Sequence, residues 1–555
     1  MKITGAQAVV RILEDHGVNL VFGYPGGAIL PLYDALRESN IKHILVRHEQ
    51  NAAHSASGYA RVTGKTGVCI ATSGPGATNL ITGIATAYMD SIPMVIITGQ
   101  VPLSAVGRDV FQEVDIVGAT FALTKHNYLV KKAADLPRIL NEAFHIASTG
   151  RQGPVLIDLP KDIAEELFEY KEMANVVIDS YQPTFQGHPK QVQRIVRAIG
   201  ECSRPVICAG GGIISADAAD ELLNIAEMCH IPVATTLMGI GAFPKDHPLS
   251  MGMLGFHGTQ YSNLAIDHAD LIFILGARAG DRAVRKMEEF GRKAIVVHVD
   301  IDPAEIGKNV NVTIPIVGNL KAVLQAVIKD IKPRKDRVRW LETIEGWKTE
   351  NKLTYLQEGK LKPQYIIEQL NHVTNADTIV TTDVGQHQMF AGAYYRTKKP
   401  RTFLTSGGMG TMGYGLPAAV GAQLGKPENP VILITGDGSF QMNLPELATV
   451  VQEQLPIKII VFNNNALGMV RELQMHFQDR RYYQVYLTGN PDFVKLADAY
   501  GIPAQRITEK QDVLQALQFM FNASGPMLTE FIVDVDENVV PPVERCPGSE
   551  KRENA

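Results

Sequence analysis

The chain has 555 residues, which is too many for one hydrophobic core and indicates about three domains. Charged residues make up 20% of the chain and hydrophobic residues 45%, a balance that is typical of globular proteins. The formal net charge of −5 gives no general attraction to nucleic acid or to anionic membranes, so we exclude both as expected partners.

The cysteines and the apolar runs indicate the cellular compartment. The five cysteines are scattered and no two have C-x-x-C spacing, which argues against a zinc site or a disulfide framework and favours a reducing compartment. Residues 1–18 fit an amphipathic helix capped by Thr4 and lack the apolar core of a signal peptide. Because no apolar run reaches the length of a membrane span, we expect a cytoplasmic protein.

The first block of the chain, residues 1–166, alternates apolar strand-like runs with helical patterns. Such alternation predicts a doubly wound α/β domain, in which a parallel sheet is covered by helices on both faces. The predicted strands are Leu20–Phe22, Ile44–Val46, Val68–Ala71, Met94–Thr98 and Val155–Asp158.

The loops that follow these strands contain the chemically interesting residues. A glycine-rich turn over residues 23–28 follows the first strand, Glu49 follows the second, and a turn containing Ser73 follows the third. A less regular segment later contains Phe111 and Gln112. Taken alone, the glycine-rich turn fits tight-turn geometry as well as it fits a functional site. For Glu49 taken alone, a carboxylate at the positive end of a helix is the favoured interpretation.

A second α/β block is predicted over residues 190–331, after a linker over about 167–189 that breaks the periodicity. Gly210, Gly211 and Gly212 follow its first strand and would let a dinucleotide approach the backbone, but the spacing is not G-x-G-x-x-G and fits a plain turn equally well. A charged helical connector over about 332–360 ends this block. The predicted strands are Pro205–Ala209, Val233–Thr235, Leu271–Leu275 and Ile295–Val299.

The third block, residues 361–535, contains the strongest local signal in the sequence. The apolar strand Val431–Thr435 enters a Gly-Asp-Gly-Ser turn, and the strand Ile457–Phe462 ends in three asparagines. Parallel strands deliver their C-terminal loops to one edge of the sheet, so Asp437 and Asn464 are predicted to meet there. With a loop carbonyl at Ala466, these oxygens suit Mg²⁺ and a bound diphosphate.

Several motifs taken together resemble the acetohydroxyacid (acetolactate) synthase catalytic subunits of the thiamine diphosphate (ThDP) superfamily, over nearly the whole chain. They are GYPGGAILPLYDAL, RHEQNAAH, TSGPGATNL, FQEVD, TKHNYLV, RQGPVLIDLPKD, TSGGMGTMGYGLPAA and GDGSF…NN. The resemblance implies a pyrimidine-binding domain at 1–166, a central FAD-binding-type domain at 190–331, a diphosphate-binding domain at 361–535 and a C-terminal tail at 536–555. It further implies a homodimer or tetramer with ThDP between subunits, and a separate small regulatory subunit.

The resemblance also assigns roles to residues. Glu49 would hydrogen-bond the ThDP pyrimidine ring and act with Gly27, Gln112 and Lys161 as the catalytic group. The metal ligands would be Asp437, Asn464 and Ala466. The coenzyme contacts would be Tyr24, Pro25, Gly26, Ser73, Gln386, His387, Gly410, Met412, Gly438, Ser439, Gly468 and Met469.

The central block matches the family's FAD-contacting positions with some departures. Ala279-Gly280 replaces the usual Phe-Asp, and Phe256 stands where Met is usual. We expect FAD in a structural rather than a redox role. The matching positions are Arg151, Gly210, Gly211, Gly212, Thr236, Leu237, His257, Gly276, Arg278 and Asp300, and the substrate channel would contain Ala28, Phe111, Phe256 and Leu473.

The implied activity is decarboxylation of pyruvate on ThDP, followed by transfer of the two-carbon unit to a second 2-oxoacid. With pyruvate as acceptor the products are 2-acetolactate and CO₂, the first common step of branched-chain amino acid synthesis. Leu473 stands where the family usually has Trp, so we expect less preference for 2-oxobutyrate. The alternatives are a ThDP- and FAD-dependent pyruvate oxidase, a flavin-independent catabolic acetolactate synthase and, because a scaffold protein would retain the fold, a non-enzymatic subunit.

Overall fold

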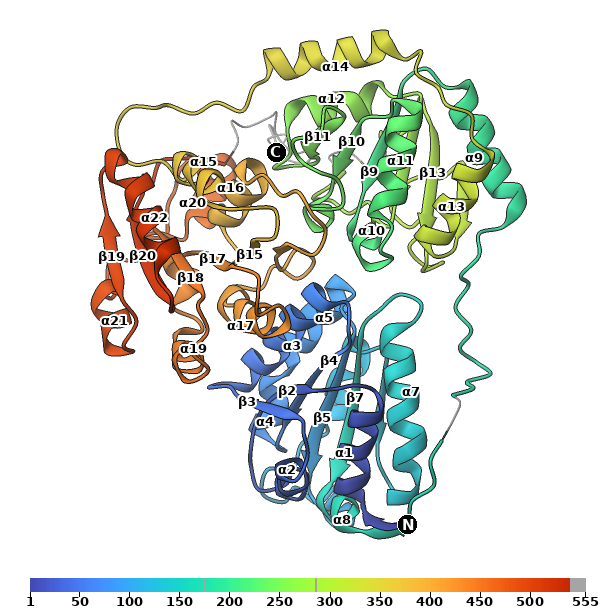
Figure 1. The fold of residues 1–555 in the computed structure, drawn as a ribbon, viewed down its shortest axis with the longest axis vertical. Coiled ribbons are helices and arrows are strands. Elements are labelled where there is room, and N and C mark those ends of the chain that lie inside the picture. The colour runs from blue at the N-terminus through green and yellow to red at the C-terminus, as the bar shows by residue number, and fades with distance from the viewer. Residues whose placement is uncertain (174–175, 285–286, 540–555) are drawn as a thin grey trace, which may run out of the picture.

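The protein, seen here in a computed structural model, is described over residues 1–173, 176–284 and 287–539 (Figure 1). Within these ranges it forms three parallel sheets of six strands each, together with one small two-stranded antiparallel sheet. Each large sheet belongs to a separate α/β domain, which confirms the predicted fold class. The predicted C-terminal tail lies outside the described residues from 540 onward. In the described part of the chain, no helix is both long and apolar enough to cross a membrane.

The N-terminal sheet has the strand order β3-β2-β4-β5-β7-β6. All the predicted strands of this block are present, although the second lies earlier than expected, and β6 at the sheet edge was not predicted. The strands are β2 (Leu20–Tyr24), β3 (Lys42–Leu45), β4 (Gly67–Ala71), β5 (Met94–Gln100), β6 (His126–Leu129) and β7 (Pro154–Pro160). The helices are α1 (Gly5–Asp15), α2 (Leu30–Arg37), α3 (Glu49–Thr63), α4 (Pro75–Asn79), α5 (Ile81–Asp90), α6 (Ile116–Thr120), α7 (Leu136–Ser148) and α8 (Lys161–Glu165), with 3-10 turns η1 (Leu103–Ala105), η2 (Phe121–Leu123) and η3 (Ala133–Asp135).

The chain start differs in part from the prediction. Thr4 caps helix α1 as expected, accepting a hydrogen bond from the Gln7 amide while the Gln7 side chain accepts from the Thr4 amide. The residues before it form strand β1 (Lys2–Thr4) rather than helix, because they pair with β8 (Leu167–Glu169). The segment predicted as a linker therefore begins with a short strand.

The central sheet has the order β11-β10-β9-β12-β13-β14. Three predicted strands are found with their predicted bounds, and the fourth extends by one residue. The strands are β9 (Pro205–Ala209), β10 (Val233–Thr235), β11 (Ser250–Met253), β12 (Leu271–Leu275), β13 (Ile295–Asp300) and β14 (Ile314–Val317). The helices are α9 (Pro189–Glu201), α10 (Gly211–Ser215), α11 (Ala219–Cys229), η4 (Leu237–Gly239), α12 (Gln260–His268), α13 (Leu320–Asp330) and, in the connector, α14 (Val338–Glu350).

The C-terminal sheet has the order β16-β15-β17-β18-β20-β19. Its two central strands, β17 (Val431–Gly436) and β18 (Lys458–Asn463), are buried throughout and match the predicted pair closely. The other strands are β15 (Ile379–Thr382), β16 (Phe403–Leu404), β19 (Ala504–Ile507) and β20 (Met527–Ile532). The helices are α15 (Pro363–Val373), α16 (Gln386–Tyr394), α17 (Gly415–Gly425), α18 (Asp437–Phe440), η5 (Leu444–Glu446), α19 (Leu447–Gln452), α20 (Gly468–Phe477), α21 (Phe493–Ala499), η6 (Lys510–Asp512) and α22 (Val513–Asn522).

The N-terminal and C-terminal domains share a hydrophobic core where helix α3 packs against α17 (Figure 1). Glycines permit this close approach: a Cβ on Gly58 would lie 2.2 Å from the Ala418 carbonyl oxygen, and one on Gly421 would lie 1.8 Å from that of Ser55. The contact matters for function because α3 begins at Glu49 and α17 follows directly on the loop of residues 405–413.

Candidate active site

Strands β17 and β18 deliver Asp437 and Asn464 to one edge of the C-terminal sheet, as the sequence predicted. The two strands pair in parallel up to Gly436 and Phe462, so the loops that follow leave the sheet side by side. Asp437, Asn464 and Ala466 all line one small cavity at this edge.

The Asp437 carboxylate is buried and held in place by hydrogen bonds. Asn490 donates to its Oδ2 atom at 2.7 Å. Burial raises the pKa of Asp437 to about 6, although hydrogen bonds from Asn490 and from the backbone amides of Gly438 and Asn464 act in the opposite direction. In the described residues no group of three or more His, Cys, Asp or Glu side chains could hold a metal. The oxygen donors at this edge are the Asp437 carboxylate, the Asn464 side-chain amide and the Ala466 backbone carbonyl, which are the kinds of ligand that hard cations take.

The remainder of this cavity is a cradle with little room for side chains. A Cβ on Gly436 would lie 2.7 Å from His387 Nδ1, and one on Gly438 would lie 2.8 Å from Leu467 Cδ2. The buried His387 ring has no partner for its Nε2 atom, and burial lowers its pKa to about 3, so the ring is neutral. A cradle of glycines, a helix start and an unpaired ring nitrogen fits a bound phosphate group.

Most of the predicted contacts of the coenzyme diphosphate lie in this cavity. Gln386 and His387 begin helix α16, and the Gln386 side chain donates to Glu472 at 2.7 Å. The predicted residues that line the cavity are Gln386, His387, Met412, Asp437, Gly438, Ser439, Asn464, Ala466, Gly468 and Met469.

The predicted pyrimidine-binding residues form a separate group in the N-terminal domain. Glu49 opens helix α3, and its carboxylate accepts a hydrogen bond from Asn79 at 2.9 Å. A Cβ on Gly26 would meet the Thr72 side chain at 2.5 Å, and one on Gly76 would meet the same side chain at 2.7 Å and Glu49 at 3.2 Å. The glycine turn, the third-strand turn and the acid are thus assembled within this domain.

The other predicted N-terminal residues lie on several segments and differ in their exposure to solvent. Gln112 has a positive φ of 60° and packs against Gly74, whereas Phe111 is 87% exposed. Ser73 is buried, Lys161 begins α8, and Ala28 lies against Gly99. Tyr24, Pro25 and Gly27 are exposed at the surface of their turn.

Among the described residues, the cavity at Asp437 is lined by only one of these two groups. All the residues that line the cavity at Asp437 come from the C-terminal domain, and Glu49 is not among them.

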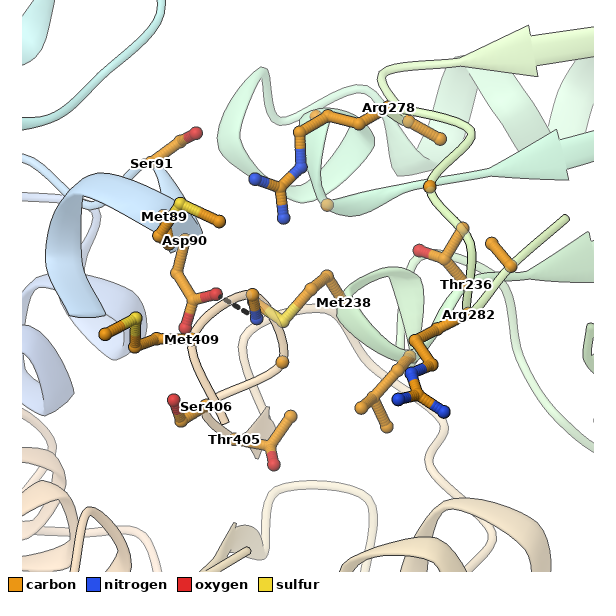
Figure 2. A pocket seen from close by; sticks show the side chains of 18 of the residues that line it. Met89, Asp90, Ser91, Thr236, Met238, Arg278, Arg282, Thr405, Ser406 and Met409 are labelled. Carbon is orange, nitrogen blue, oxygen red and sulfur yellow. Dashed lines mark hydrogen bonds between the residues drawn. The ribbon is translucent and has the colours of Figure 1, made fainter. Parts of the chain in front are cut away.

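A larger cavity of about 780 Å³ lies where the three domains meet (Figure 2). This volume is in the range of cavities that hold small-molecule cofactors. Predicted FAD contacts that line it are Arg151, Gly211, Gly212, Thr236, Leu237, His257, Gly276, Arg278 and Asp300. Gly410, Met469 and Leu473 also line this cavity.

Two predicted residues of the central domain lie outside that cavity. Gly210 packs beneath it, where a Cβ would lie 2.1 Å from the Gly276 carbonyl oxygen. Phe256 packs edge-on against His257 and under the Arg282 guanidinium, and its place in a substrate channel stays a prediction.

The larger cavity contains both charges and unpaired polar atoms. Arg151 forms ion pairs with Asp302 at 3.2 Å and Glu305 at 2.8 Å, and the second Glu305 oxygen is buried without a partner. Burial raises the pKa of Asp300 to about 6 and lowers that of His257 to about 4. These groups can bind the polar parts of a dinucleotide, while glycine backbone at Gly211–Gly212 permits close approach.

Comparison with protein families assigns the class. Three models of thiamine pyrophosphate enzymes match the chain: the N-terminal TPP binding domain over residues 3–119, the central domain over 192–327 and the C-terminal TPP binding domain over 383–531. The fold is thus that of a thiamine pyrophosphate (ThDP) enzyme.

Comparison with individual proteins narrows the class. The chain is 47% identical to a probable acetolactate synthase large subunit of Methanocaldococcus jannaschii, with 97% of this chain and 93% of that protein covered. It is 48% identical to the acetolactate synthase large subunit of Buchnera aphidicola subsp. Acyrthosiphon pisum and 45% identical to that of Haemophilus influenzae; in both cases 97% of this chain and 96% of the relative are covered. The chain belongs to the acetolactate synthase family.

Proposed function

We propose that the chain is the catalytic subunit of a ThDP-dependent acetolactate synthase. It would decarboxylate pyruvate and transfer the two-carbon hydroxyethyl unit to a second 2-oxoacid, which gives 2-acetolactate and CO₂ when the acceptor is pyruvate. The observation that carries this proposal is the cavity in which Asp437, Asn464 and Ala466 meet above the glycine cradle. The family membership supports the same activity.

When bound, ThDP supplies the electron sink that decarboxylation of a 2-oxoacid requires. Asp437, Asn464 and the Ala466 carbonyl would hold Mg²⁺ against the diphosphate, with the neutral His387 ring and Gln386 beside it. Support comes from the donor set, from the unpaired His387 Nε2 atom and from glycines whose Cβ atoms would fill the cradle. By the family resemblance, Gly410 and Met412 would orient the aminopyrimidine.

Glu49 would hold a proton at the pyrimidine N1′ atom and so assist the proton transfers at the coenzyme. We propose that it acts on ThDP held by a second copy of the chain, so that a homodimer is the smallest active unit and tetramers are larger assemblies of it. This arrangement is supported by the cavity at Asp437, which no residue of the same chain's N-terminal domain lines.

The access route would be formed by the N-terminal loop residues Gly27, Ala28, Phe111, Gln112 and Lys161, which would exclude water from the reacting groups. Leu473 lines the larger cavity beside Met469. A Leu side chain offers less apolar contact surface than Trp to the additional methylene group of 2-oxobutyrate, so we propose pyruvate rather than 2-oxobutyrate as the main acceptor.

We propose that the larger cavity binds FAD in a structural role. The residues present fit the group: glycine backbone lies beside Arg278, and Glu305 has a buried oxygen without a partner. A pyruvate oxidase would use the same cavity for electron transfer, and a flavin-independent synthase would leave it without a flavin.

The names of the relatives refer to a large subunit, which supports a separate regulatory subunit for this chain as well.

One assay tests the proposed function. Pyruvate is supplied with ThDP and Mg²⁺, with and without FAD, and acetolactate, acetaldehyde, peroxide and oxygen uptake are measured. We expect acetolactate with little acetaldehyde and no peroxide. Peroxide formation coupled to oxygen uptake would identify an oxidase. Full activity of the FAD-free protein would contradict the proposed need for bound FAD. Acetaldehyde without acetolactate would contradict the transfer of the two-carbon unit to a second 2-oxoacid.

A further inference from the structure

Asp90, at the end of helix α5, joins the N-terminal and C-terminal domains. Its side chain is fully buried. One carboxylate oxygen accepts a hydrogen bond of 2.7 Å from the Gly408 backbone amide, and the other forms an ion pair of 2.6 Å with Arg61 (Figure 2 shows the Gly408 bond). Arg61 lies near the end of α3, the helix that begins at Glu49.

Gly408 belongs to the loop of residues 405–413, which contributes to both cavities. Residues 405–410 line the larger cavity, and Met412 lines the smaller one. The loop is also held by a hydrogen bond of 2.7 Å between the Thr86 and Thr411 hydroxyls and by one of 2.8 Å from the Gly413 amide to Asp383. A movement of the loop at Gly408 would therefore change the lining of both cavities.

The contact at Gly408 is tight on three sides. A Cβ there would lie 2.7 Å from Asp90 Oδ1, 2.8 Å from the Met89 carbonyl oxygen and 3.0 Å from an Arg278 nitrogen. Asp90, from the N-terminal domain, and Arg278, from the central domain, thus approach the same backbone position of the C-terminal domain. A buried carboxylate paired on both oxygens holds such a position with little freedom, because losing either partner leaves a costly unpaired group.

We infer that Asp90 is a positioning residue: it fixes the 405–413 loop, and through this loop a ligand in the larger cavity changes the affinity of the smaller cavity for ThDP. The inference rests on the proposed function, which assigns FAD to the larger cavity. It gives the flavin a function without electron transfer, since a ligand packed against residues 405–410 would restrict the segment that ends at Met412. By linkage, ThDP would tighten FAD binding by the same factor.

Calorimetric titration tests the inference without relying on turnover. ThDP with Mg²⁺ is titrated into purified full-length protein, once saturated with FAD and once freed of FAD. For the wild-type chain we expect FAD to lower the ThDP dissociation constant by about fivefold or more, the usual size of coupling between two sites. In the Asp90→Asn variant we expect this factor to fall to about one, because a neutral amide holds both Arg61 and the Gly408 amide less firmly.

A second variant and a control separate positioning from loss of stability. Gly408→Ala retains the charges of Asp90 and Arg61 but displaces the loop, because its Cβ would lie 2.7 Å from Asp90 Oδ1 and 2.8 Å from the Met89 carbonyl oxygen. It should also lose the coupling, and it tests the inference if Asp90→Asn does not fold. Asp246→Asn removes another carboxylate that pairs with a cation of a different domain, Lys398 at 3.3 Å, but both side chains are about half exposed and neither lines a cavity. It should retain the wild-type factor.

The outcomes distinguish the inference from the proposed function. Absence of FAD binding in the wild-type chain would overturn the assignment of the larger cavity and the inference with it. FAD binding that leaves ThDP affinity unchanged, or an unchanged factor in folded Gly408→Ala, would overturn only the inference. Coupling that is lost in both variants supports the inference even if the pyruvate assay yields no acetolactate.

Discussion

The Asn490 side-chain amide donates a hydrogen bond of 2.7 Å to the Asp437 carboxylate. The same amide lies 3.1 Å from the Asn465 side-chain oxygen and 3.4 Å from that of Asn463. Asn490 therefore connects the turn after β17 with the turn after β18, and it orients the carboxylate that we propose as a metal ligand. A residue that hydrogen-bonds a metal-binding side chain, as Asn490 does here, keeps that side chain in the orientation that binds the metal.

Replacing Asn490 by Ala should weaken Mg²⁺ binding. The Asp437 carboxylate would lose its side-chain donor, so we expect the Mg²⁺ concentration for half-maximal activity to rise by about tenfold or more, with a smaller change in kcat at saturating Mg²⁺. Asn429→Ala is the matched control, because the Asn429 side-chain amide donates at 2.7 Å to the Asp377 carbonyl oxygen before the start of β17, at the opposite end of that strand from Asp437, and neither residue lines the cavity. Equal Mg²⁺ dependence in both variants would show that Asn490 does not support the metal.

Gly468→Ala should disrupt ThDP binding specifically. The new Cβ would lie 2.0 Å from Gln386 Oε1 and 2.8 Å from Asn464 Nδ2, so two residues of the cavity would be displaced. We expect the dissociation constant for ThDP to rise by at least about tenfold, on the scale of roughly 1–3 kcal/mol for overpacking. Gly525→Ala, whose Cβ would meet nothing within 4 Å and which does not line the cavity, is the control and should bind ThDP as the wild type does.

The strands that carry the site were predictable because their signals are local. Val431–Thr435 and Ile457–Phe462 are continuous apolar runs, as buried parallel strands require, and both are found with bounds within a residue of those predicted. Strand β6 was missed because it lies at a sheet edge, and its partly exposed polar residues break the apolar pattern. Asn490 was missed because it lies in a loop, and only the fold brings it to Asp437.

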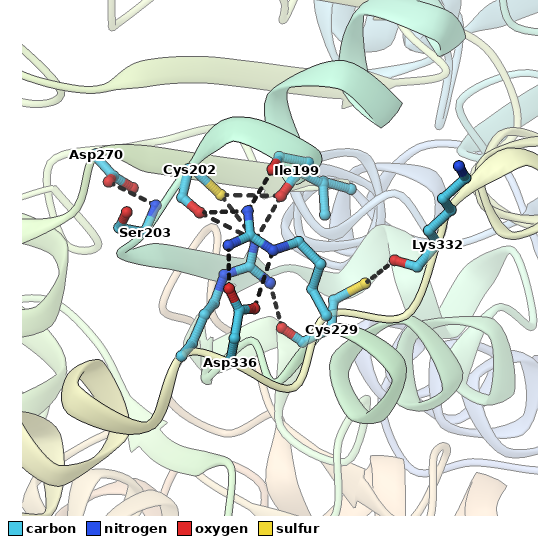
Figure 3. Close-up of polar contacts among 10 residues, drawn as sticks. Ile199, Cys202, Ser203, Cys229, Asp270, Lys332 and Asp336 are labelled. Atoms are coloured by element: carbon cyan, nitrogen blue, oxygen red, sulfur yellow. Dashed lines mark hydrogen bonds and ion pairs between the residues drawn. The ribbon is translucent and has the colours of Figure 1, made fainter.

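The charged connector was predicted only in outline. Helix α14 is present, but the basic residues before it are not simply solvated. Arg337 is 3% exposed and donates to the carbonyl oxygens of Cys229 and Ile199, near the ends of α11 and α9, as part of the network in Figure 3. Helix ends leave such carbonyls unsatisfied, so the guanidinium stabilises both helices. Sequence composition alone does not distinguish a buried arginine that binds backbone carbonyls from an arginine at the surface.

Leu473→Trp should change the choice of acceptor. In a competition assay with equal pyruvate and 2-oxobutyrate, the wild-type chain should form mainly 2-acetolactate. The Trp variant should form a larger share of 2-aceto-2-hydroxybutyrate, because a larger side chain at this wall of the cavity reshapes the acceptor pocket. Leu473→Met conserves side-chain volume and should behave as the wild type does. A wild-type chain that already forms mostly 2-aceto-2-hydroxybutyrate would refute the assigned role of Leu473.

Asp158 should make stability depend on pH. Burial raises the pKa of its carboxyl to about 7, although Thr98 and Gln100 donate hydrogen bonds to it. Because this pKa is higher in the folded state than the usual 3.8, the folded chain binds the proton more tightly, and its stability falls as pH rises from about 4 to 7.

The Asp158→Asn variant has no such ionisation. Between pH 5 and pH 8, its free energy of unfolding should therefore increase relative to that of the wild type by roughly 3 kcal/mol. Urea unfolding of both proteins at the two pH values measures this difference. The same difference at both pH values would show that Asp158 does not titrate in this range.

Mixed dimers test the central claim, that ThDP binds between Glu49 of one chain and Asp437 of another. The inactive variants Glu49→Gln and Asp437→Ala are co-expressed, so that a hybrid dimer has one site with both changes and one site with neither. With random pairing, half the dimers are hybrids with one intact site, and activity should return to about a quarter of the wild-type value. If both residues instead served the same site from one chain, no hybrid would have an intact site, and the mixture would be as inactive as its parents.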